Sequence, residues 1–87
     1  MTNTMVILTN VNNMIAILDD NFDCTKLTKG DLYAGCRNTG WELGICQYVA
    51  PELNCIQAVA GMIYPYDINE CKKITKLISM DDIRIAV

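Results

Sequence analysis

The residues best suited to chemistry in this sequence gather around one short polar stretch, Arg37-Asn38-Thr39-Gly40-Trp41. It holds the only tryptophan and one of the two arginines, and it lies between two segments that alternate like strands. The turn-forming Asn-Thr-Gly therefore predicts a hairpin with an aromatic and a guanidinium group at its tip. Both groups can stack on a base, clamp a carboxylate or phosphate, or anchor a protein interface. The predicted binding residues are Tyr33, Arg37, Asn38, Thr39, Trp41 and Glu42.

A structural role for the same residues is the alternative. Trp41 would then close one end of the core, with Arg37 stacked over it. Gly35 and Gly44 lie on either side of the turn, inside the predicted strands, where glycine often permits close approach of a ligand or of backbone. A small ligand is therefore expected at this surface if the chain binds one.

Catalytic chemistry has little support in the sequence. The chain has no histidine, so the usual general base near neutral pH is absent. Cys36 adjoins the cation Arg37, but consecutive strand residues point to opposite faces. We predict no catalytic residue and no enzyme, with a thiol enzyme using Cys36 or Cys46 as a distant alternative.

The five cysteines indicate a reducing compartment. They form no C-x-x-C pair and have no histidine to complete a zinc site, so we predict no metal site and no cofactor. No basic leader or long apolar run is present, and we predict a cytoplasmic protein without membrane association. Core thiols are the main interpretation, and a disulfide between Cys46 and Cys55 is the alternative.

The charge balance says more about partners than about chemistry. A net charge of −3 argues against nucleic-acid binding driven by phosphate neutralisation. Charged residues make up only 20% of a chain that is 52% hydrophobic, so its surface is lean in charge. A homo-oligomer would bury the surplus apolar area, although a well-filled monomer also fits.

Two helices are expected. Val11, Met14, Ile15, Leu18 and Phe22 recur at intervals of three and four, which predicts a helix over 11–22. A capping box, Asp67-Ile68-Asn69-Glu70, begins a second apolar stripe over 68–78. Residues 23–30 are interpreted as a connection, with Thr28-x-x-Asp31 as an alternative helix start.

Five strands complete the expected fold, over residues 4–8, 32–37, 41–46, 55–62 and 83–87. For 51–63 a helix beginning at Pro51 is the alternative. The order is β-α-β-β-β-α-β: a single α+β domain over 1–87, an antiparallel sheet with two helices packed on one face. In element order alone it resembles a ferredoxin-like sandwich.

The expected function follows from the lack of an identifiable catalytic set and from the low charge of the chain. We predict a non-enzymatic binding protein that occupies a protein partner, of the type that a virus or phage uses to inhibit a host defence system. It should present a contiguous apolar or aromatic surface. The alternative is an oligomer that sequesters a nucleotide-like small molecule, with Arg37 and Trp41 gripping phosphate and base.

Overall fold

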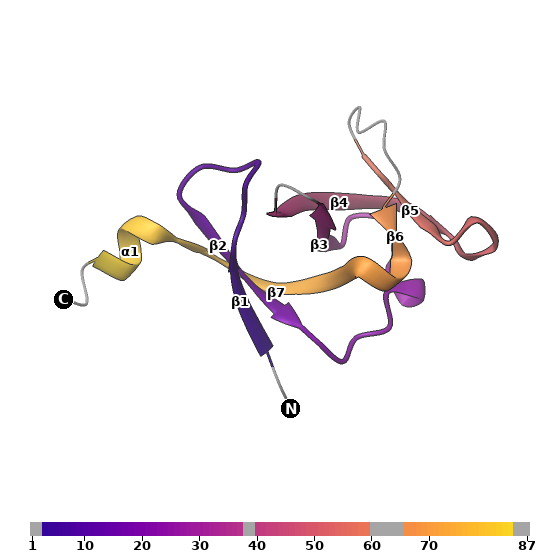
Figure 1. Cartoon of the computed structure of the whole chain (residues 1–87), viewed down its shortest axis with the longest axis horizontal. Coiled ribbons are helices and arrows are strands. Elements are labelled where there is room, and N and C mark those ends of the chain that lie inside the picture. Colours follow the sequence, from indigo (N-terminus) through magenta and orange to yellow (C-terminus); the bar gives the residue numbers. More distant parts are fainter. Residues whose placement is uncertain (1–2, 38–39, 60–65, 85–87) are drawn as a thin grey trace.

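The expected two-helix sandwich is wrong, because the computed structural model is an antiparallel β-sheet (Figure 1). The structure describes residues 3–37, 40–59 and 66–84. Within them the sheet has the strand order β1-β2-β7-β3-β4-β5-β6. The one α-helix among the described residues, α1, spans only Met80–Arg84.

The first predicted helix is a strand. β1 (Asn3–Ile7), which confirms the first expected strand, pairs with β2 (Met14–Asp19) in an antiparallel hairpin. The turn between them contains Asn13 at φ 61°, a conformation that asparagine tolerates better than most residues. In β2, Ala16 and Leu18 are buried on one face while Ile15 and Ile17 lie on the other. Because both faces are apolar, the spacing imitated a helix.

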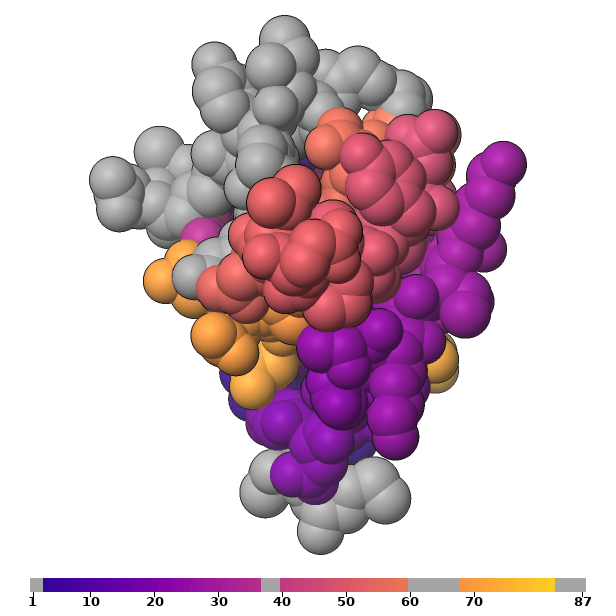
Figure 2. All heavy atoms as spheres, turned by 90° about the vertical axis from the view of Figure 1, so that its right-hand side faces the viewer, coloured from indigo at the N-terminus to yellow at the C-terminus, as the bar shows by residue number. Residues whose placement is uncertain are grey.

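The central strands confirm three of the expected runs. β3 (Leu32–Arg37) pairs with β4 (Gly40–Ala50), which then pairs with β5 (Cys55–Ala58). Pro51–Leu53 forms a 3-10 turn rather than the alternative helix, and residues 60–62 of the predicted strand over 55–62 lie outside the described residues. The β4–β5 hairpin projects from one end of the molecule and faces the viewer in Figure 2.

The second predicted helix is also a strand. β6 (Tyr66–Asp67) is followed by a 3-10 turn at Ile68–Glu70, where the capping box lies, and then by β7 (Cys71–Ser79). The register with β2 moves from Ile17↔Lys76 to Leu18↔Ile74, so Thr75 is an extra, bulged residue. Its hydroxyl donates to the carbonyl of Ile17.

This bulge explains the misleading pattern. In a regular strand, Ile74 and Leu77 would point to opposite faces, because they are three positions apart. With Thr75 inserted between them, both pack in the same core cluster. A bulged strand therefore produced the three-residue spacing of a helix.

The chain end also differs from expectation. Instead of a strand over 83–87, Ile83 and Arg84 complete α1, and residues 85–87 lie outside the described residues. The 23–30 connection is confirmed and contains a 3-10 turn at Cys24–Lys26. The carboxylate of Asp31 accepts from the backbone N–H and hydroxyl of Thr28, but β3 follows it at Leu32 and no helix begins there.

The curled sheet closes on itself at the residues that follow β1. Leu8 forms a parallel bridge with Trp41 on the edge of β4 that β3 leaves open, and the N–H of Thr9 donates to the Trp41 carbonyl over 2.8 Å. The side chain of Asn10 then bonds both backbone groups of Leu43. Its Nδ2 donates to the carbonyl over 3.0 Å, and its Oδ1 accepts from the N–H over 2.8 Å. An amide side chain thus takes the place of a strand residue.

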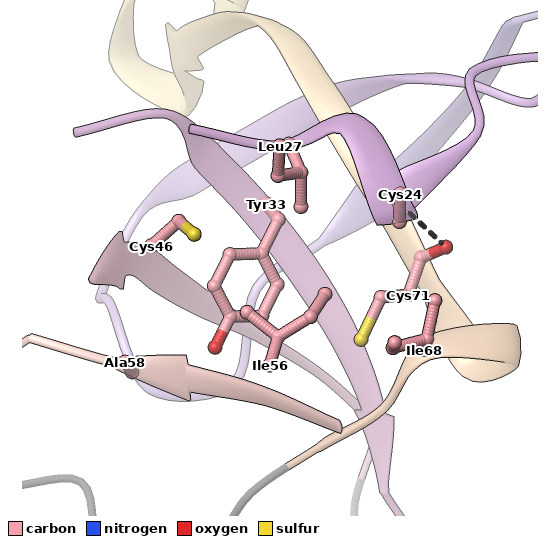
Figure 3. Close-up of a cluster of buried hydrophobic side chains, with 8 residues drawn as sticks. All are labelled: Cys24, Leu27, Tyr33, Cys46, Ile56, Ala58, Ile68 and Cys71. Carbon is pink, nitrogen blue, oxygen red and sulfur yellow. Dashed lines mark hydrogen bonds between the residues drawn. The ribbon is translucent and has the colours of Figure 1, made fainter. Parts of the chain in front are cut away.

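Two hydrophobic clusters lie on opposite faces of β3. The inner cluster, inside the curled sheet, is built from Leu8, Ala16, Leu18, Ala34 and Ile74. The second cluster lies under the β4–β5 hairpin and the 20–31 connection (Figure 3). Its members are Cys24, Leu27, Tyr33, Cys46, Ile56, Ala58, Ile68 and Cys71. Tyr33 and Ala34, adjacent in sequence, are both fully buried, one in each cluster.

If the Asn10 side chain holds the sheet closed, its removal should lower the stability of the fold. Asn10→Ala removes two hydrogen bonds to exposed backbone, and we expect the free energy of unfolding to fall by about 1–2 kcal/mol. Urea denaturation measures this loss. Asn12→Ala is the matched control, since Asn12 is exposed in the same loop, and it should change stability by no more than about 0.5 kcal/mol. Equal losses in the two variants would show that the Asn10 bonds do not hold the sheet closed.

Candidate binding surface

The residues predicted to form a binding site do not come together on one surface. Tyr33 is fully buried in the second cluster, whereas Trp41 packs against the inner cluster, as the alternative interpretation expected. Glu42 is partly exposed, and the backbone of Arg37 pairs with Gly40. Asn38 and Thr39 lie outside the described residues. Binding at this hairpin stays a prediction, but in this fold Tyr33 is a core residue.

The close approach that Gly44 permits is taken by the Tyr33 ring. The two residues are opposite each other in the β3–β4 ladder. A Cβ at position 44 would lie 2.5 Å from Cζ and 2.8 Å from Oη of that ring. The glycine therefore exists so that the aromatic ring can cross the neighbouring strand, and it gives a ligand no additional room.

The buried thiols have the wrong properties for catalysis. Cys24, Cys46 and Cys71 are buried in the second cluster, and the Cys24 thiol donates to the Cys71 carbonyl over 3.3 Å (Figure 3). Burial raises the pKa of Cys24 and of Cys46, whereas a nucleophilic cysteine needs a lowered one. Cys36 is exposed and Cys55 is partly buried.

The alternative disulfide is excluded by the strand register. Cys46 is opposite Ala58, while Cys55 is opposite Ala50, at the other end of the same hairpin. At about 3.3 Å per residue these positions are roughly 13 Å apart, well beyond the span of a disulfide. None of the five cysteines, all of which lie in the described residues, forms a disulfide.

Charged groups form no compact centre in the described part of the chain. There, no set of three or more cysteine or carboxylate side chains is placed to hold a metal ion. The carboxylates of Asp23 and Asp31 accept hydrogen bonds from Thr25 and Thr28, which lower their pKa. Asp23 is exposed and Asp31 is partly exposed, and both carboxylates stabilise turns. None of the described helices has the length and apolar character needed to cross a membrane.

An apolar surface that the sequence did not reveal lies on the outside of the β1–β2–β7 sheet. Residues directly opposite in antiparallel strands share a face. The register places Ile7 beside Ile15 and Ile15 beside Ile78, and it places Met5 beside Ile17. We call these five residues the outer face: Met5, Ile7, Ile15, Ile17 and Ile78. Ile15 is buried and Ile17 and Ile78 are partly buried, so the exposed area comes mainly from β1. Met5 is 60% exposed and Ile7 61% exposed, unusually high values for large apolar side chains in a strand.

The outer face escaped sequence reasoning for one reason. The spacing of apolar residues predicts two separate helices for Ile15 and Ile17 on the one hand and Ile78 on the other, and separate helices do not make these residues neighbours. The available signal was the β-branched pair Ile15 and Ile17, which alternates with Ala16 and Leu18 as in a strand apolar on both sides.

A second group of exposed apolar residues lies on the projecting hairpin, well separated in the sheet order from β1 and β2. Ile45 is 44%, Tyr48 54% and Leu53 73% exposed. Leu53 lies in the 3-10 turn at the tip, so these residues follow one strand and its turn rather than adjoining strands. The outer face is the surface on which apolar side chains join across strands.

Comparison with protein-family models, with curated proteins and with solved structures found no match.

The Tyr33–Gly44 pair gives a testable packing prediction. Gly44→Ala should lower the free energy of unfolding by about 1–3 kcal/mol, because the new methyl group overlaps the Tyr33 ring. The same substitution in a Tyr33→Leu background should cost clearly less, and a double-mutant cycle by chemical denaturation measures the difference. Equal costs in the two backgrounds would contradict the contact.

Proposed function

We propose that this chain is a non-enzymatic binding protein that acts by occupying a partner protein, and that the outer face is its contact surface. The observation that carries the proposal is the pair of exposed side chains Met5 and Ile7, which lie beside partly buried Ile17 and buried Ile15 on the adjacent strand. Contiguous exposed apolar patches on small proteins commonly mark interaction sites. Inhibition of a host system by such occupation is the biological setting that we propose for it.

The chemistry of the face favours a protein over a small ligand. Its side chains are unbranched or β-branched aliphatic groups on consecutive strands, without a carboxylate, amide or guanidinium group among them. Small-molecule sites usually combine an apolar concavity with a few polar groups that fix orientation. Lys76, which is exposed opposite Ile17, provides a charged rim of the kind that borders protein interfaces.

Two further properties agree with a binding role in the cytoplasm. Three thiols are buried with the character of core residues, and none of the five cysteines forms a disulfide. The low content of charged residues leaves apolar area that a partner can cover.

The test compares two equivalent changes of charge. Ile17→Glu places a carboxylate in the middle of the outer face, where Lys76 on β7 can pair with it and preserve the fold. Leu53→Glu is the matched control, since it introduces the same charge at an exposed leucine on the projecting hairpin. Circular dichroism confirms that both variants are folded.

We expect a protein captured by the wild type to be retained by Leu53→Glu and to bind Ile17→Glu at least about tenfold more weakly in direct titration, a loss of about 1.4 kcal/mol. Native mass spectrometry of freshly purified protein provides the opposing result. A stoichiometric small molecule released on denaturation would overturn the proposal in favour of sequestration, as would equal partner binding by the two variants.

A further inference from the structure

The edge of β1 that faces away from β2 carries backbone N–H and C=O groups, and no described strand pairs with its first residues. The N–H of Leu8 donates to the carbonyl of Met14, which fixes the alternation of the β1–β2 ladder. Thr4 and Val6 therefore bond to β2, while the backbone groups of Asn3 and Met5 point away from it. The N–H of Thr9 also points away from β2, and it is bonded to Trp41 of β4. Among the described residues, the closure thus covers the edge at Leu8–Asn10 and leaves the outward groups of Asn3 and Met5 without a neighbouring strand.

This edge has none of the usual protection against pairing. Natural edge strands are commonly guarded by lysine, proline or a bulge, or are very short. β1 has the sequence Asn-Thr-Met-Val-Ile, without charge or proline, and its register with β2 is unbroken. β6, at the other end of the sheet order, is only two residues long.

We propose that β1 pairs with β1 of a second copy of this chain, antiparallel and about a two-fold axis beside Met5. In that register Met5 is opposite its own copy and Asn3 is opposite Ile7. Met5 is a residue whose backbone groups point outward and lie clear of the bridge to Trp41, so it can exchange both hydrogen bonds with its own copy without moving either sheet. The interface is isologous and closes after two copies.

The charge distribution favours a second copy of the chain as the partner, and it favours antiparallel over parallel pairing of the two β1 strands. The chain has a net charge of −3, yet β1 contributes no charge, so two copies can meet there without like charges in contact. Asp19 is opposite Asn3, and Asp20 accepts from the hydroxyl of Thr4, so one end of β1 is acidic. Parallel pairing would bring these carboxylates together from both copies, whereas antiparallel pairing places them at opposite ends.

The pairing would also enlarge the outer face. Directly opposite residues share a face, so Met5 and Ile7 of both copies lie on the same side of a continuous sheet. Self-association depends on the edge of β1 and the proposed function on the side chains of its face. The inference therefore goes beyond the proposed function, and either can fail without the other.

The test blocks the edge without breaking the hairpin. Met5→Pro removes an N–H that points away from β2, so no bond of the β1–β2 ladder is lost, and proline is tolerated at such edge positions. Met5→Thr is the matched control, because it removes the same side chain and keeps the N–H. Sedimentation velocity over about 1 μM to 1 mM is suited to the weak dimer expected of a small interface.

We expect wild type and Met5→Thr to dimerise, and Met5→Pro to dimerise at least about tenfold more weakly. Asn3→Lys, which adds a natural type of edge guard at an exposed position, should weaken dimerisation as well and replaces the proline variant if that one does not fold. A wild type that remains monomeric throughout, or edge variants that dimerise as well as wild type, would overturn the proposal.

Discussion

The structure depends on the contact between Leu8–Asn10 and the edge of β4. β4 pairs with β3 along its first half and with β5 along its second half, so the edge beside Trp41 and Leu43 would otherwise be open. The Leu8–Trp41 bridge and the paired Asn10 amide cover that edge and curl the sheet. Only in the curled sheet do Leu8, Ala34 and Ile74 share one interior.

The same closure determines what remains on the outside. Because the chain leaves β1 at Leu8 to reach β4, the preceding residues diverge from β4 toward the N-terminus, and β2 is their only neighbour among the described strands (Figure 1). Closure of the sheet through Leu8 and Trp41 therefore leaves the edge of β1 unpaired among the described strands, beside an apolar face. Burial of β3 on both sides and the exposed Met5 and Ile7 of the outer face agree with a chain that is 52% hydrophobic.

Sequence reasoning succeeded where local alternation and turn residues agreed. The runs that became β3, β4 and β5 have period-two patterns separated by turn residues, and their existence and type were predicted correctly. The prediction was wrong at β2 and β7, because there the spacing of apolar residues depends on contacts with other strands. The bulge at Thr75 and the double-sided burial of β2 depend on neighbouring strands that the sequence does not identify.

The predicted site residues also depend on knowing which strands are neighbours. Trp41 and Tyr33 were attractive because of their chemistry, but strand parity sends them to different clusters. The outer face consists of aliphatic residues from three strands, and it becomes visible only when Ile7, Ile15 and Ile78 are known to be adjacent. Asn10 is the least predictable part, since its role requires a partner 33 residues away.

Hydrogen exchange at two neighbouring amides tests the central claim, that closure leaves the β1 edge open and a second copy occupies it. The amide of Val6 faces β2 and should be protected at every protein concentration, whereas that of Met5 should exchange rapidly in dilute solution and slow as concentration rises. Site-resolved NMR exchange measures both in one sample. A Met5 amide that exchanges at the same fast rate at all concentrations would contradict the account.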